Sequence, residues 1–135
     1  MRFVLDTNEF IGAFKAKPNP TVSNLLNKLT TEQHPLFITR TIINEVRRNL
    51  STINFSRFIK FIHIIATIHE DAFVPFEIGI KYGSLGLKPA DTFIAAYCEW
   101  IKADVLVSEN RHFLTRTSNL PFKVLTAEKT LLLLK

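Results

Sequence analysis

The chain has few of the features that mark secreted or membrane proteins. Cys98 is the only cysteine among 135 residues, so the chain cannot form an internal disulfide, and a reducing compartment is the more natural setting. The N-terminus has no basic stretch followed by a long apolar run, so we expect no signal peptide. The most apolar segment, residues 58–68, contains Lys60 and His63 and is too short to span a bilayer. We therefore expect a cytoplasmic protein without a membrane segment.

Internal repeats, low-complexity tracts and glycine-rich phosphate loops are also missing from the sequence. There are 4 glycines and neither a Gly-x-Gly-x-x-Gly nor a Walker-type motif, which argues against an ordinary nucleotide-binding α/β domain. Acidic residues number 12 against 17 lysines and arginines. This basic excess favours a polyanionic partner, although alone it is weak evidence. The 47% hydrophobic content predicts a single domain over residues 1–135 with one sizeable core.

Short apolar runs alternate with helical periodicity along the chain. The runs predict strands at residues 3–5, 35–39, 105–107 and 122–125, and a further short strand is possible within residues 69–75. The periodicity predicts helices at residues 8–14, 21–29, 41–50, 55–68, 76–82, 89–103 and 131–134. Such alternation is typical of an α/β fold in three layers, with a central parallel sheet of about four or five strands between helices. We expect residues 41–50 and 55–68 to form a helical hairpin.

Helix starts in this pattern have several candidate caps. Thr21 or Ser23 is expected to cap the second helix, after a stop at Pro18 and Pro20, and Thr41 to cap the third. Pro89 suits the first turn of the helix that follows it.

Acidic residues occur where these elements begin or end. Asp6 closes the first strand, and Glu109 follows the strand at residues 105–107; sites in parallel sheets lie beyond the carboxyl ends of the strands. Asp91 lies in the first turn of its helix, on an apolar face that should point inward, where a carboxylate needs a partner. Glu45 lies at the margin of an apolar helix face and should be half-buried.

Each of these acids also has an ordinary structural interpretation. Asp6 could cap a helix, Asp91 could be a helix-start acid, Glu45 could be solvated, and Glu109 could be a turn residue. Taken together in a basic chain, they predict a divalent-metal site, because clustered carboxylates repel one another unless a cation neutralises them.

The four acids stand in sequence motifs that form a family pattern. Asp-Thr-Asn occupies residues 6–8, Ile-Asn-Glu-Val residues 43–46, Pro-Ala-Asp-Thr residues 89–92, and Val-Ser-Glu-Asn-Arg-His-Phe residues 107–113. In this order the motifs resemble those of PIN-domain ribonucleases, including the toxins of the VapC type, over essentially the whole chain. Many members have an aspartate in the fourth motif, where this chain offers Glu109 or Asn110.

The resemblance implies a metal-dependent endoribonuclease that hydrolyses RNA phosphodiester bonds with Mg²⁺ or Mn²⁺. It assigns catalytic roles to Asp6, Glu45, Asp91 and Glu109. Asp6 and Asp91 would be the principal metal ligands, and Glu45 would bind directly or through water. Supporting or substrate contacts would come from Thr7, Asn8, Ser108, Asn110 and His112. The chemistry suits these residues, because hard cations prefer oxygen ligands and lower the pKa of bound water.

Partners and alternatives follow from the same resemblance. We expect an RNA substrate, a cognate antitoxin and a homodimer, and hence the toxin of a toxin–antitoxin pair.

The altered fourth motif leaves an alternative, a catalytically weak PIN-like domain that binds RNA or protein. His112 could instead be a turn histidine beside Phe113. A basic group could follow an RNA backbone or be a solvated face; its members are Arg40, Arg47, Arg48, Arg57 and Lys60.

Overall fold

The fold is built on one five-stranded sheet in which every strand pair is parallel. The structure is a computed structural model that describes residues 1–115 and 119–135. The strands are β1 (Phe3–Leu5), β2 (Leu36–Thr39), β3 (Ala66–His69), β4 (Val105–Val107) and β5 (Lys123–Leu125). Their order across the sheet is β3-β2-β1-β4-β5. The expected parallel sheet is confirmed.

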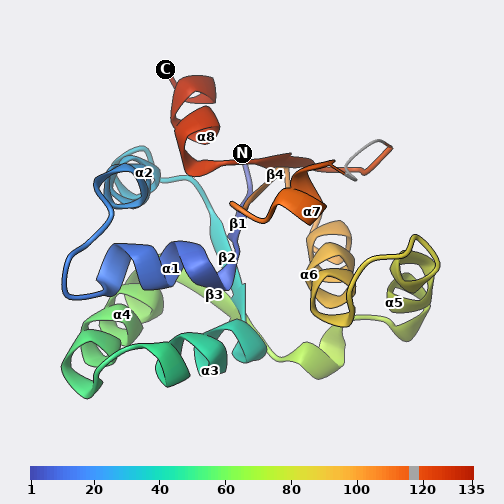
Figure 1. The fold of residues 1–135 in the computed structure, drawn as a ribbon, viewed down its shortest axis with the longest axis horizontal. Coiled ribbons are helices and arrows are strands. Elements are labelled where there is room, and N and C mark those ends of the chain that lie inside the picture. The colour runs from blue at the N-terminus through green and yellow to red at the C-terminus, as the bar shows by residue number, and fades with distance from the viewer. Residues whose placement is uncertain (116–118) are drawn as a thin grey trace.

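Helices cover both faces of the sheet. The elements are α1 (Thr7–Phe14), α2 (Pro20–Thr31), α3 (Arg40–Asn49), α4 (Thr52–Ile65), the 3₁₀ turn η1 (Asp71–Phe73), α5 (Phe76–Gly83), α6 (Pro89–Trp100), α7 (Arg111–Thr115) and α8 (Ala127–Leu133). Figure 1 shows α1 to α4 on one side of the sheet and α5 and α6 on the other. The three-layer arrangement is confirmed, as is the helical hairpin of α3 and α4. Among the helices of the described residues, none has the length and apolar character needed to cross a membrane.

The core lies on both faces of the central strands, against α1–α4 on one side and against α6 on the other. Every residue of β1 and β4 is fully buried, as expected for strands covered on both faces. Phe10 of α1 and Phe58 of α4 are also fully buried and meet edge to face with ring centroids 5.3 Å apart. This contact holds α1, the helix that directly follows β1, in place over the sheet.

The prediction of a helix through residues 66–68 is wrong. Helix α4 ends at Ile65, and Ala66 begins β3, which pairs with Leu36 at the start of β2. Thr67 and Ile68 are β-branched and therefore accept a strand readily. Pairing with β2 decides the outcome, because the apolar run alone fits either structure.

Several predicted helix ends are also corrected. Thr39 caps α3 in place of Thr41, and Asn19 caps α2 in place of Thr21 or Ser23, which makes Pro20 the first residue of α2. Helix α6 ends at Trp100 instead of near residue 103, and α8 begins at Ala127 instead of residue 131. The short helix α7 was not predicted.

Replacing the α2 cap provides a test of this local assignment. Oδ1 of Asn19 accepts hydrogen bonds from the backbone N–H groups of Thr21 at 2.9 Å and Val22 at 3.4 Å. We expect Asn19→Ala to lower the free energy of unfolding by about 1 kcal/mol. The control Asn24→Ala removes an exposed side chain from the middle of the same helix and should cost nothing measurable. Equal urea-unfolding midpoints for the two variants would contradict the cap.

Candidate functional site

The candidate site lies where the direction of strand addition reverses. Strands β2 and β3 are added to one side of β1, and β4 and β5 are then added to its other side. Ligands of open α/β sheets bind at this kind of switch point, outside the carboxyl ends of the strands. Asp6 directly follows β1 and Ser108 directly follows β4, and the backbone N–H of Asp6 donates to the carbonyl of Val107 at 2.9 Å.

Asp6 both caps α1 and faces the switch point. Its Oδ1 accepts from the backbone N–H of Thr7 at 2.9 Å, and its Oδ2 accepts from the hydroxyl of Ser108 at 2.9 Å. Burial raises the pKa of Asp6, and the charge of Asp91 adds to the rise, while the bonds from Ser108 and Thr7 partly oppose it. The structural and functional interpretations of Asp6 are thus compatible.

Asp91 approaches the same place from α6. It is 9% exposed and shares the inward face of α6 with the buried residues Ile94 and Cys98. The side-chain amide nitrogen of Asn110 lies 3.4 Å from both carboxylate oxygens of Asp91. The backbone N–H of Asn110 donates to Oγ of Ser108 at 3.1 Å. Ser108 and Asn110 therefore connect Asp6 to Asp91.

Glu45 reaches the site through Thr7. The hydroxyl of Thr7 donates to Oε2 of Glu45 at 2.9 Å, which ties α3 to the first residue of α1. Glu45 is half-buried, as its sequence position predicts. Asp6, Glu45 and Asp91 come from segments far apart in the chain, and this set of contacts brings them to the same edge of the sheet.

Glu109 is directed away from Asp91. Its Oε2 accepts from the backbone N–H of Ala127 at the start of α8, 3.1 Å away. Asn110, the other candidate in the fourth motif, is the residue beside Asp91.

Asn8 and His112, two predicted supporting residues, lie in different pockets. Asn8 is exposed and lines a separate pocket together with Glu109. His112 lines a pocket with Asp91, and its backbone N–H donates to Oδ1 of Asn110 at 3.0 Å.

Glu9 is a buried acid that sequence reasoning missed. It is only 1% exposed, and its carboxyl group contacts that of Glu109. Burial, followed by the hydrogen bond and charge of Glu109 and the charge of Asp6, raises the pKa of Glu9 to about 9. Within the described residues, Oε1 of Glu9 receives no hydrogen bond, so the two carboxyl groups are best described as sharing one proton. An acid in the first turn of a helix is ordinary in sequence, and nothing local distinguishes Glu9.

Solved structures share this architecture. The chain is similar to VapBC2 from Rickettsia felis (18% identity, 93% of this chain and 98% of that chain, TM-score 0.66). It is similar to FitAcB from Neisseria gonorrhoeae (16% identity, 93% and 98%, TM-score 0.69) and to PAE2754 from Pyrobaculum aerophilum (19% identity, 99% and 95%, TM-score 0.67). The chain has a PIN-type fold. Comparisons with protein-family models and with curated proteins gave no match.

The acids of this PIN-type fold suit a hydrated divalent cation better than a closed metal cage. No group of three or more acidic, histidine or cysteine side chains in residues 1–115 and 119–135 is placed to hold a metal. Asp6 and Asp91 form a pair whose mutual repulsion helps to raise the pKa of Asp6. Mg²⁺ is commonly held by one or two carboxylates and keeps several waters. The pair therefore fits such an ion, whereas a direct bond from Glu45 stays a prediction.

Ser108 should be essential to this arrangement because it bonds both Asp6 and Asn110 while being fully buried. If the Asp6–Asp91 pair holds a divalent ion, we expect Ser108→Ala to weaken Mn²⁺ binding by roughly 10- to 100-fold, the usual cost of losing a group that orients a ligand. Titration of the purified protein with Mn²⁺ measures this. Ser84→Ala, at the exposed C-cap of α5, is the matched control. Equal affinities for both variants would remove Ser108 from the site.

Proposed function

We propose that the chain is a metal-dependent endoribonuclease that uses Mg²⁺ or Mn²⁺. The observation that carries the proposal is the pairing of Asp6 with Asp91 at the switch point of the PIN-type fold, connected through Ser108 and Asn110. The formal net charge of +5 suits a polyanionic substrate. The similarity to VapBC2 and FitAcB supports the fold on which this proposal rests.

Each residue of the site would have a separate role in the proposed hydrolysis. A divalent cation, when bound, neutralises the phosphate and lowers the pKa of a water molecule. Asp6 and Asp91 would hold the ion, and the side-chain amide nitrogen of Asn110, which faces Asp91, would orient that carboxylate. Thr7 occupies Oε2 of Glu45, which leaves Oε1 to accept a proton from the attacking water. Ser108 keeps Asp6 oriented throughout.

The direct test is cleavage of a labelled, unstructured RNA by the purified protein. We expect cleavage in Mg²⁺ or Mn²⁺, none in EDTA, and recovery when the ion is restored. Asp6→Asn should be inactive in the same preparation, which excludes a contaminating nuclease. Cleavage that persists in EDTA, or in the Asp6→Asn protein, would contradict the proposal.

A toxin role with an antitoxin partner is the second part of the proposal. An apolar groove of about 260 Å³ lies between α1, α2 and α4, with Phe14, Leu26 and Phe61 in its lining. Similarity to VapBC2 and FitAcB makes an antitoxin segment the natural occupant of this groove. Expression of the wild type alone should arrest growth, Asp6→Asn should not, and co-expression of a short neighbouring gene should relieve the arrest. Unimpaired growth with active protein present would favour a housekeeping nuclease.

A homodimer is supported by apolar side chains on the outer layer around α5. Phe73, Phe76 and Ile80 are 67%, 77% and 58% exposed, an apolar concentration that a second copy could cover. Sedimentation at increasing protein concentration tests this, with Ile80→Glu expected to shift the equilibrium toward the monomer. A concentration-independent monomer would exclude it.

The alternative, a catalytically weak PIN-like binding domain, is favoured by one observation: Asn110, a neutral residue, stands beside Asp91. Replacing it by aspartate adds a carboxylate where the ion would bind. If the wild type binds RNA without cutting it while Asn110→Asp cuts in Mg²⁺, the binding role is the correct one.

A further inference from the structure

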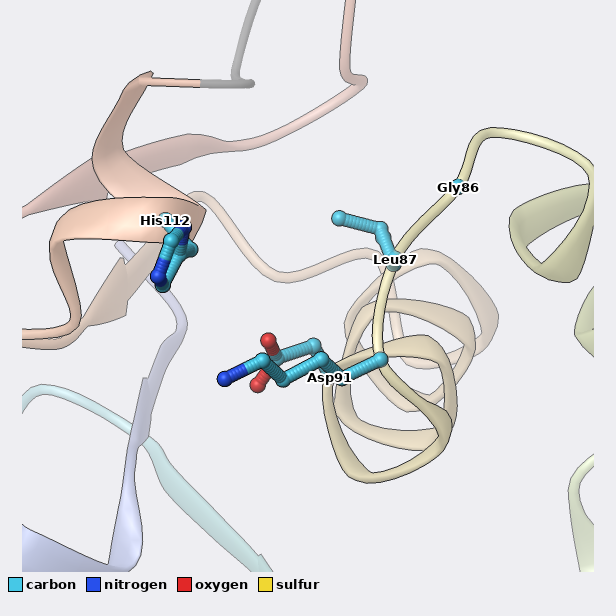
Figure 2. Close-up of a pocket in the computed structure, with 5 residues that line it drawn as sticks. Gly86, Leu87, Asp91 and His112 are labelled. Carbon is cyan, nitrogen blue, oxygen red and sulfur yellow. The ribbon is translucent and has the colours of Figure 1, made fainter.

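A small pocket that contains Asp91 has walls that the chemistry proposed above does not use. It has a volume of about 160 Å³ and is lined by Gly86, Leu87, Lys88, Asp91 and His112. Figure 2 shows His112 and Leu87 on opposite sides of the pocket, with Asp91 between them and lower in the view. The pocket therefore connects directly with one of the two carboxylates that would hold the metal.

The walls of the pocket differ in chemistry. The imidazole of His112 is exposed and lines one side of the pocket, whereas Leu87 is a half-buried apolar side chain that packs against the core. Lys88 is exposed and carries a positive charge beside Asp91. A flat aromatic ring, an apolar surface and a lysine are the groups with which proteins bind single-stranded nucleic acid, through base stacking and phosphate contacts.

Both walls are attached to the site. The backbone N–H of His112 donates to Oδ1 of Asn110 at 3.0 Å, and the amide of Asn110 lies against Asp91. On the opposite side, the hydroxyl of Thr92, next to Asp91 in α6, lies 3.5 Å from the carbonyl oxygen of Leu87. A ligand between the walls would consequently be held at a fixed position relative to Asp91.

We propose that this pocket receives the base of a nucleotide that adjoins the scissile phosphate, stacked on His112 and covered by Leu87. This rests on the proposed ribonuclease function and deepens it by assigning a base-binding pocket beside Asp91. A base inside a duplex is stacked and paired on both sides and cannot enter a pocket of this kind without being extruded. Lys88 would contact the backbone phosphate of the same strand.

Binding of small fragments to the full-length protein tests the pocket itself. In Mg²⁺, nucleoside 5′-monophosphates should bind roughly 5- to 150-fold more tightly than ribose 5-phosphate, the range expected from stacking one base on an aromatic ring. His112→Ala should remove this difference, and His112→Phe should restore it because phenylalanine stacks without an ionisable nitrogen. His63→Ala, an exposed histidine of α4, should keep the difference. Equal affinities for both fragment types in the wild type would overturn the base pocket.

Cleavage of RNA separates this inference from the function on which it rests. The wild type should cut an unstructured oligonucleotide at least about 10-fold faster than the same sequence in a duplex. An abasic nucleotide beside the mapped cut should slow the wild type and have little further effect on His112→Ala. Metal-dependent cleavage that ignores both pairing and the missing base would overturn the pocket and leave the nuclease intact. Absence of any metal-dependent cleavage would overturn the nuclease and this inference together.

Discussion

Asp91→Asn is expected to abolish Mg²⁺-dependent RNA cleavage while leaving the protein at least as stable as the wild type. The loss of rate should exceed roughly 100-fold, because a metal ligand matters more than the groups that orient it. Stability should hold because Asp91 repels Asp6 in the ion-free protein and helps to raise the pKa of Asp6. Removing this charge relieves an unfavourable interaction, and asparagine can still contact Asn110.

Thermal melting in EDTA, paired with cleavage assays in Mg²⁺, checks both halves of this expectation. Asp104→Asn is the matched control: its carboxylate accepts from the backbone N–H of Arg2 before β4 begins, at the opposite edge of the sheet. That variant should cleave at the wild-type rate. If the Asp91→Asn protein melts at a lower temperature and still cuts RNA, Asp91 is a structural residue and the catalytic assignment is wrong.

Glu9→Gln should stabilise the protein at neutral and alkaline pH and change the shape of its pH–stability curve. The pKa of Glu9 is raised from an ordinary value of 4.5 to about 9, so the folded protein holds a proton that the unfolded chain releases. The contribution of Glu9 to the free energy of unfolding is therefore greatest below about pH 4.5. It declines as the pH rises and is smallest above about pH 9. Glutamine stays neutral and can donate to Glu109, so the decline should disappear.

The measurement is urea unfolding at several pH values. We expect Glu9→Gln and the wild type to be equally stable near pH 4 and the variant to be more stable by about 2 kcal/mol or more at pH 8. Glu128→Gln changes an exposed acid that lines the same pocket as Glu9 and Glu109, and this variant should follow the wild type at every pH. A Glu9→Gln protein that is less stable at pH 8 would show that Glu9 is ionised and stabilising.

The sequence by itself determined the class of fold and the edge of the sheet at which Asp6 and Ser108 lie. Alternating apolar runs and helical periodicity require strands buried on both faces and helices that cover them, and this forces a parallel sheet. Asp6 and Ser108 could be placed at its carboxyl edge because each directly follows an apolar run. The inward face of Asp91 followed from helix periodicity alone. These are local properties, set by the backbone within a few residues.

Tertiary structure decided which neighbouring side chain serves the site. Glu109 and Asn110 are adjacent in sequence, and only the turn after β4, held by contacts to Asp6 from 102 residues away and to α8, directs Asn110 to Asp91 and Glu109 to Ala127. The pKa of Glu9 is raised first by burial within the fold and then by the Glu109 carboxyl that the fold brings beside it. Residues 66–68 became β3 because β2 offered an unpaired edge. In each case the deciding contact joins distant segments, which sequence periodicity does not encode.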